Sequence, residues 1–286
     1  MHWTEPEVYC LAETQIDQKE LERMLSDLGA KHEMHNVSDI EELVEIDGRL
    51  CYMAFEDKNN PGSYLNPNVT RIREGNDKYI ANIKRSGHGS VIEHGTVQFT
   101  FHNISRIFSH ELVRHRVGSF SQESLRYVRV DNLGMWLPNI FKDSPEIKRA
   151  MEQAGKDSEK WYQEILETST FEHLHEDPKH QKTDEHRRCS LDCMDDLPFD
   201  IKKKITSAAR RVLPIGLSTT IAWTTNMRNL RHVIEMRTSR YSEEEMRLVF
   251  GKVADIAIEK WPNLFNDYTI EIIDGIPEYS TKSNKI

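Results

Sequence analysis

The chain has 286 residues, of which 37% are hydrophobic and 30% charged, with a formal net charge of -9 at pH 7. This composition is ordinary for a globular protein. It excludes a membrane-spanning protein, because no apolar run approaches the roughly 20 residues of a membrane helix, and it disfavours a nucleic-acid binder, because an acidic chain repels phosphate. Residues 1–10 lack the basic-then-apolar pattern of a signal peptide, so we expect a cytoplasmic protein.

Three helices are predicted in the first third of the chain. Asp17 is a helix-capping residue type, and Gly29 is a typical stop, so the first helix lies between them. Ser38 with Glu41 three residues later forms a capping box that begins the second helix. The third helix covers about residues 69–85, before a glycine.

A short helical turn, a strand and a further helix follow. Ser90 and Glu93 have capping-box spacing and predict one short turn. Apolar and polar side chains alternate over residues 97–102, as in a half-buried strand. Ser105 is predicted to cap the next helix, which runs to about Arg116.

Residues 131–197 are the least regular stretch, with several prolines and a charged, histidine-rich segment. We interpret them as a divergent insertion with one or two helices, one of them around residues 159–168, and a loop. Apart from this insertion, residues 1–286 are predicted to form a single domain.

The four cysteines are expected to be reduced thiols, because this long chain has no secretion signal. Cys189 and Cys193 lie just after His180 and His186, which raises the alternative of a zinc site. A second ligand pair of the kind that closes a structural zinc site is missing, so a polar surface insertion is favoured and no metal site is predicted.

The final third has regular patterns again. The predicted elements are a helix over about 200–213, a strand over 218–225 and helices over about 227–240 and 243–261. The last helix has an apolar stripe that indicates core or interface, made of Met246, Val249, Phe250, Val253 and Ala257. Helices combined with a few mostly antiparallel strands predict an α+β fold.

Residues 114–127 concentrate three arginines, a histidine and several hydroxyl groups in an otherwise acidic chain. Arginine forks match phosphate or carboxylate groups, so this segment suits an anionic ligand. A solvated helix end is the alternative interpretation of Arg114 and Arg116, since basic residues are favoured there.

Arg237 is a second candidate. It lies seven residues after Leu230 and so continues the apolar face of its helix, where a charge is costly without a partner. Its partner is either a ligand or a salt bridge, for example to Glu235 of a neighbouring chain or to the insertion.

Five clustered histidines raise the alternative of a zinc hydrolase: His88, His94, His102, His110 and His115. The sequence His110-Glu111 followed by His115 is one residue longer than the zinc-protease motif, and the two rings point roughly 140° apart on a helix. Neither a G-x-G-x-x-G loop nor a P-loop is present. A nucleotide- or RNA-binding module with Phe120 and Tyr127 as stacking rings is a further alternative.

The string Arg114-His115-Arg116, seven residues and then Ser124 resembles the signature of the flavin-dependent thymidylate synthases. Three further segments resemble motifs of that family in the same order, namely residues 87–94, residues 209–214, and residues 223–226 with Arg237. The likeness covers about residues 40–130 and 200–265.

This resemblance implies an enzyme that methylates dUMP to dTMP with FAD, a methylenetetrahydrofolate donor and NADPH. It implies a homotetramer with shared sites. The implied FAD contacts are His88, Ser90, Arg114, His115, Arg116, Gln122, Asn226, Arg228 and His232. The implied dUMP contacts are Glu111, Arg114, Gln122, Ser124, Arg126, Arg210 and Arg237. Of these residues, His88, Ser124 and Arg237 are the implied catalytic ones.

Three positions depart from the family's pattern, namely Gln122, Ser121 and the pair Ser242-Glu243. None of the cysteines lies in the arginine cluster. An alternative to addition of a cysteine is polarisation of the uracil ring. Arg237, beside the ring, is predicted to stabilise the developing negative charge. Reduced flavin supplies the hydride, and Ser124 orients the nucleotide.

Overall fold

The computed structural model describes residues 1–175 and 190–283. They form two compact units. Unit 1 comprises Met1–Glu7, Phe101–Arg114 and Ser121–Ile221, and unit 2 comprises Val8–Thr100, His115–Phe120 and Ala222–Ile286. None of the helices in the described ranges has the length and apolar character needed to cross a bilayer.

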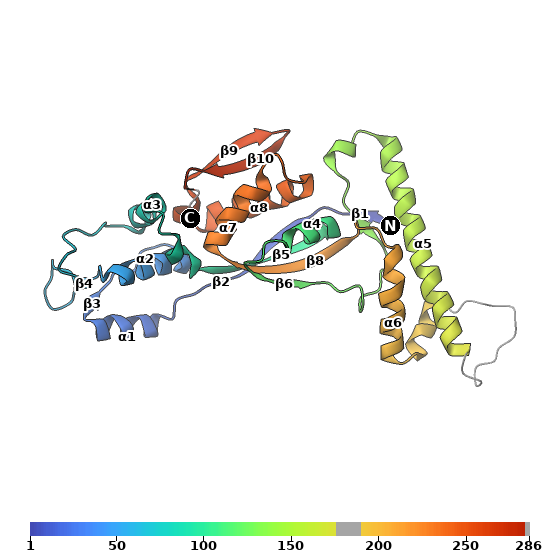
Figure 1. The fold of residues 1–286 in the computed structure, drawn as a ribbon, viewed down its shortest axis with the longest axis horizontal. Helices are drawn as coiled ribbons and strands as arrows, with labels where there is room; N and C mark the ends of the chain where they lie inside the picture. Colours follow the sequence, from blue (N-terminus) through green and yellow to red (C-terminus); the bar gives the residue numbers. More distant parts are fainter. Residues whose placement is uncertain (176–189, 284–286) are drawn as a thin grey trace. The chain divides into compact units, whose positions relative to one another are not determined.

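The strands form one four-stranded sheet and three small pairs, labelled in Figure 1. The larger sheet has the order β2-β5-β8-β6, with bounds Glu7–Glu13, Thr96–Ser105, Ser218–Asn226 and Ser119–Gln122. The pairs are β1 (His2–Trp3) with β7 (Gly134–Met135), which is parallel, and two antiparallel ones: β3 (Ala30–Lys31) with β4 (Glu56–Asp57), and β9 (Tyr268–Ile273) with β10 (Ile276–Thr281). With the helices below, they confirm the expected α+β class.

The helical part of unit 1 is built on a long helix, α5 (Pro145–His175), beside α6 (Phe199–Ala209). The helix α5 is longer than the one predicted around residues 159–168, and α6 ends before residue 213, where its predicted end lay. The short helix η4 (Leu191–Asp196) packs with them around a core that includes Tyr162, Leu166, Met194 and Ile205. After α6 the chain forms a 3-10 turn, η5 (Arg210–Val212), and Leu213 is extended, as the residue before a proline prefers.

Two helices of unit 2 confirm their predicted caps. The side chain of Asp17 accepts from two backbone N–H groups at the start of α1 (Gln18–Leu28), and Gly29 ends it with φ 67°. Ser38 and Glu41 make the reciprocal capping box of α2 (Asp39–Tyr52). These signals were correct because each is complete within four residues of chain.

Three predicted boundaries are wrong. The helix α3 (Asn76–Ser86) begins later than residue 69, because Gly75 has φ 93° and breaks the helix there. The turn η1 (Gly89–Glu93) starts after His88 without a side-chain cap, so the Ser90 box does not form. The Ser105 cap is confirmed, but α4 (Arg106–Leu112) ends four residues before Arg116.

The C-terminal part of unit 2 contains α7 (Met227–Thr238), α8 (Glu244–Lys260), α9 (Pro262–Phe265) and the hairpin β9–β10. All five residues of the predicted apolar stripe on α8 are fully buried, and α8 packs against α7, α9 and β10. The stripe is therefore core within the chain.

A buried ion pair links α7 to the start of the hairpin. Arg231 is 1% exposed, and its two terminal nitrogens donate to Asp267 at 2.9 and 2.8 Å. Asp267 also accepts from Lys84 Nζ at 2.8 Å and from the Thr281 hydroxyl at 2.6 Å. Burial raises the pKa of Asp267, but the hydrogen bonds and charges of Arg231 and Lys84 outweigh it and hold that pKa far below its usual range. This carboxylate is thus charged and fully partnered.

Candidate functional site

The residues implied to form the site fall in both units, and each unit is described by itself. Unit 1 contains Glu111, Arg114, Gln122, Ser124, Arg126 and Arg210. Unit 2 contains His88, Ser90, His115, Arg116, Asn226, Arg228, His232 and Arg237.

In unit 2, Arg237 and His115 form a direct side-chain pair. Arg237 Nε donates to His115 Nε2 at 2.6 Å. Burial, followed by the charges of Arg237 and His232, lowers the pKa of His115 from 6.5 to about 4. The imidazole is therefore neutral at physiological pH, with its Nε2 as the acceptor and its proton on Nδ1. This contact orients the guanidinium through its Nε, and His115 itself adds no negative charge.

The expected burial of Arg237 is wrong in degree. Its side chain is half-buried, in the last turn of α7, and the arginine that is fully buried on this helix is Arg231. The inner face of α7 runs through Leu230, Arg231, Ile234 and Thr238. Sequence reasoning missed Arg231 because its partner, Asp267, lies far away in the sequence.

The segment His115–Phe120 is fastened to α7 and to the end of β8 through its backbone. The Val117 carbonyl accepts from Asn229 Nδ2 at 3.0 Å and from the Thr225 hydroxyl at 3.2 Å. Asn226, an implied FAD contact, caps α7 by accepting from Asn229 N at 2.8 Å. Asn229 was not singled out from the sequence, since a lone asparagine in a first helical turn carries no distinctive signal.

Gly118 is required by close approach. Its φ is 153°, and a Cβ there would lie 2.6 Å from the Thr224 carbonyl oxygen and 2.6 Å from Trp223 Nε1. Only glycine fits such a position. The segment that carries His115 and Arg116 therefore lies directly on the strand.

The implied flavin residues on η1 lie beside the start of α7. His88 is half-buried and stacks on Tyr52, with ring centroids 5.9 Å apart. Ser90 is exposed, and Glu93 at the end of the turn pairs with Arg228 at 2.5 Å. His232 and Arg116 are also exposed, so unit 2 presents several cationic or neutral donor groups to solvent.

In unit 1 the nucleotide residues lie around α4 and the turn that follows β6. Gln122 Nε2 donates to the Ser109 hydroxyl at 2.9 Å. The Ser124 hydroxyl accepts from the backbone N–H of Arg126 at 3.4 Å, a contact that orients the turn and supplies no general base.

Arg106 is a charged residue near this turn that sequence reasoning missed. Its terminal nitrogen donates to the Glu123 carbonyl at 3.1 Å, and its buried Nε has no hydrogen-bond partner among the described residues. Burial lowers the pKa of Arg106; the charge of Glu123 opposes this shift, and the charge of Arg210 adds to it.

The alternatives are affected differently by the structure. Tyr127 stacks on Phe199 at 6.2 Å and lies under Lys203, so its exposed ring face has a partner within the chain. His110 is on α4, whereas His115 lies beyond the end of that helix, so the two cannot act as a helical zinc motif. Cys193 is half-buried, and Cys189 with His180 and His186 lies outside the described residues.

Among the described residues, the one group of three potential metal ligands is His32, His35 and Glu42. None of these belongs to the histidine cluster that suggested a hydrolase. The zinc-hydrolase alternative therefore has no assembled ligand set in the described part of the chain.

Sequence and structure comparisons agree on the class of protein. A profile of the family described as thymidylate synthase complementing protein matches residues 33–263. The flavin-dependent thymidylate synthase of Corynebacterium diphtheriae is 30% identical over 239 residues, 83% of each chain, and that of Mycobacteroides abscessus is 33% identical over 240 residues, 82% of each chain. A UMP/dUMP methylase, PolB from Streptomyces cacaoi, solved with 5-Br dUMP, shares the fold with a TM-score of 0.59 at 19% identity, over 93% of this chain and 96% of that one.

These matches define an enzyme family of nucleotide methylation. The chain belongs to the flavin-dependent thymidylate synthases. The family resemblance carried by the Arg114-His115-Arg116 string is thereby confirmed at the level of the family, while the role of each site residue stays a prediction.

Proposed function

We propose that this chain catalyses the reductive methylation of dUMP to dTMP, with methylenetetrahydrofolate as carbon donor and NADPH-reduced FAD as the source of hydride. Membership of the family supports the reaction class. The observation in the structure that carries the proposal is the Arg237–His115 pair, a half-buried guanidinium held by a neutral imidazole.

The chemical problem is to make ring carbon 5 of uracil nucleophilic. Negative charge then develops on a uracil carbonyl and ring nitrogen. A pre-oriented guanidinium stabilises such charge in a site from which water is excluded. His115 fixes the Nε side of Arg237 without adding a negative charge, so we assign Arg237 to the uracil and His115 to the orientation of Arg237.

The donor set of unit 2 fits a flavin dinucleotide. Bound FAD supplies the hydride that no side chain can supply. We assign His88, stacked on Tyr52, to the flavin ring, and we assign Ser90, Asn226 and His232 to its polar groups. Arg116 and Arg228 supply positive charge for its pyrophosphate.

The nucleotide phosphate is assigned to unit 1. Arg106 and Arg210 supply two guanidinium groups whose mutual repulsion a phosphate relieves. Ser124, Gln122, Glu111, Arg114 and Arg126 are assigned to the rest of dUMP. The Ser124 hydroxyl serves as a hydrogen-bonding group that holds the nucleotide, because no general base is bonded to it.

The test is formation of dTMP by the purified, FAD-loaded chain. Tritium release from dUMP labelled at ring position 5 should require the folate donor and NADPH together. Methylation that continues without any reductant contradicts a flavin mechanism, and a protein that stays colourless after incubation with FAD contradicts the cofactor.

Assembly and location are a separate part of the proposal. We infer a homotetramer in the cytoplasm from the family resemblance; the α8 stripe gives no support, because it is buried within the chain. Light scattering should give a mass near four times the 33.5 kDa of the chain. A monomeric mass at micromolar concentration contradicts this inference.

A further inference from the structure

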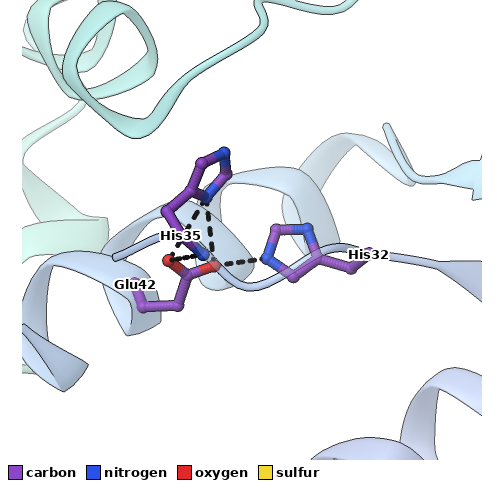
Figure 2. Close-up of side chains that lie close together, drawn as sticks. All are labelled: His32, His35 and Glu42. Atoms are coloured by element: carbon purple, nitrogen blue, oxygen red, sulfur yellow. Dashed lines mark hydrogen bonds and ion pairs between the residues drawn. The ribbon is translucent and has the colours of Figure 1, made fainter. Parts of the chain in front are cut away.

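Two histidines and a glutamate from the stretch that runs from β3 into α2 meet in unit 2 (Figure 2). His32 follows β3 directly, His35 lies in the connection to α2, and Glu42 is on the first turns of α2. Their side chains are 4%, 29% and 1% exposed. Imidazole nitrogens and carboxylate oxygens are ligands that zinc takes in proteins.

The spacing of the ligand atoms is close to that of a tetrahedral ion. Zinc bonds of about 2.0–2.1 Å place tetrahedral ligands roughly 3.3 Å apart. His35 Nδ1 lies 3.4 and 3.3 Å from the two oxygens of Glu42 and 3.5 Å from Glu45 Oε2. His32 Nε2 lies 2.6 Å from Glu42 Oε1, a hydrogen-bond length. For an ion to bind, the contact between His32 Nε2 and Glu42 Oε1 must therefore lengthen by well under an ångström, and the proton that now bridges these two atoms must leave.

The charge around the site favours a cation. Three carboxylates of α2 are buried, Glu41, Glu42 and Glu45, and the helix contributes one buried arginine, Arg49. A buried excess of negative charge is costly unless a cation compensates it.

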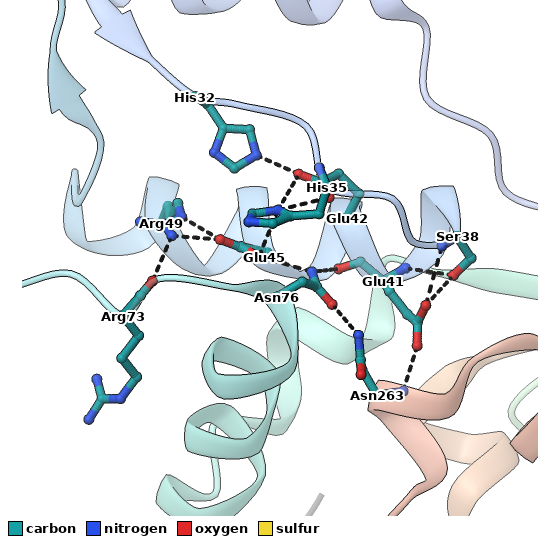
Figure 3. Close-up of polar contacts among 10 residues, drawn as sticks. All are labelled: His32, His35, Ser38, Glu41, Glu42, Glu45, Arg49, Arg73, Asn76 and Asn263. Carbon is teal, nitrogen blue, oxygen red and sulfur yellow. Dashed lines mark hydrogen bonds and ion pairs between the residues drawn. The ribbon is translucent and has the colours of Figure 1, made fainter.

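The partners of these carboxylates single out Glu42 (Figure 3). Glu41 accepts from Ser38 and from the backbone N–H of Asn263. Glu45 accepts from Arg49 and Asn76. Glu42 instead faces the two imidazoles and the backbone N–H of His35, which donates at 3.1 Å. That N–H contact holds Glu42 in place in the way that second-shell groups orient metal-binding carboxylates.

A route to the cluster exists. A cavity of about 480 Å³ is lined by both histidines together with Tyr64 and Glu74. It is large enough for water to reach the ion and complete its coordination.

We propose that His32, His35 and Glu42 form a binding site for a zinc-class divalent cation, with Glu45 or a water molecule as the fourth ligand. The site would fasten the loop before α2 to that helix. It is separate from the residues assigned to dUMP and flavin, and it does not depend on the proposed reaction. Without metal, the same groups are held together by protons that the ion displaces.

The test measures zinc on the full-length, FAD-loaded chain after chelator treatment. The chain is equilibrated with buffered free zinc, and bound zinc is counted by mass spectrometry. We expect His35→Gln and Glu42→Gln to weaken binding of one zinc equivalent at least about tenfold. Two control variants should keep that equivalent: His173→Gln, an exposed histidine on α5, and Cys193→Ser, near the histidine-rich segment.

A melting curve supplies the second readout. Zinc should raise the melting temperature of the wild-type chain and of both controls, and should leave that of Glu42→Gln unchanged. Two results overturn the proposal: zinc binding that is equal in the wild type and both cluster variants, or no bound zinc at 100 μM free metal. Because His35 is partly exposed, His35→Gln keeps the test decisive if Glu42→Gln does not fold. Loss of the equivalent only in Cys193→Ser would assign the metal elsewhere.

Discussion

Replacing Arg237 by alanine tests the proposed activation of uracil. The change removes the guanidinium, including its hydrogen bond to His115. Losing a key charge-stabilising donor lowers turnover about 10²–10³-fold, equivalent to about 2.7–4 kcal/mol. Losing a hydrogen bond of a half-buried group costs about 0.5–1.5 kcal/mol of folding stability. For a chain of this size that lowers the melting temperature by no more than about 6 °C.

The assay is dTMP formation together with a melting curve and flavin absorbance for each variant. Arg237→Lys should recover little activity, because an ammonium group cannot reproduce the planar fork. Arg240→Ala is the matched control: Arg240 lies three residues on, is exposed, and pairs with Glu278 on the surface. It should keep full activity. The reasoning is refuted if Arg237→Ala remains fully active, or if it loses stability in step with activity and lysine restores both.

Three further predictions concern stability. The pKa of His115 is about 4 in the folded chain, against 6.5 ordinarily, so between these values the unfolded imidazole takes up a proton that the folded one does not. The stability present above pH 6.5 is therefore lost as the pH falls toward 4. The difference in free energy of unfolding between pH 7 and pH 5, measured in urea, should be smaller for His115→Gln than for the wild type, and an identical difference in the two proteins would contradict this. Asp267→Ala should lower the free energy of unfolding, measured in urea, by about 3–5 kcal/mol, because it leaves the charge of Arg231 buried and uncompensated. A decrease of less than about 1 kcal/mol would disprove this prediction. Gly118→Ala should destabilise the chain by more than about 1 kcal/mol and reduce activity, because its Cβ meets the Thr224 carbonyl; an unchanged melting temperature and rate would count against it.

The helices of this chain could be predicted wherever their signals are local. Asp17, Gly29 and Ser38 act on residues within one turn of themselves, and the structure has each of them in the predicted role. The strands of the C-terminal hairpin were not predicted, because β9 has four exposed residues and no clear alternation. Likewise, the start of α3 depends on the positive φ of Gly75, a conformation that the sequence allows without requiring.

In the candidate site, too, the local signals could be predicted from the sequence and the contacts between distant residues could not. The arginine and histidine string identified the family, since order and spacing along the chain are visible in a sequence. The pairs that side chains form in space are not visible in a sequence. The rule of seven residues directed attention to Arg237, whereas the fully buried arginine of that helix is Arg231, whose partner lies 36 residues further on. For the same reason His32, His35 and Glu42 attracted no notice, because they meet only after the loop before α2 folds back.

The ion pair between Arg231 and Asp267 also bears on where this protein can be cut. The segment shared with the family profile ends at residue 263, before Asp267, Thr281 and Tyr279. Yet Tyr279 is 2% exposed and its hydroxyl donates to Asp255 of α8 at 2.5 Å. The stretch matched by the family profile is thus shorter than the piece of chain that packs together here. A fragment ending at 263 would carry every residue assigned to the reaction and still lack the carboxylate that Arg231 requires, so it should be degraded or aggregate.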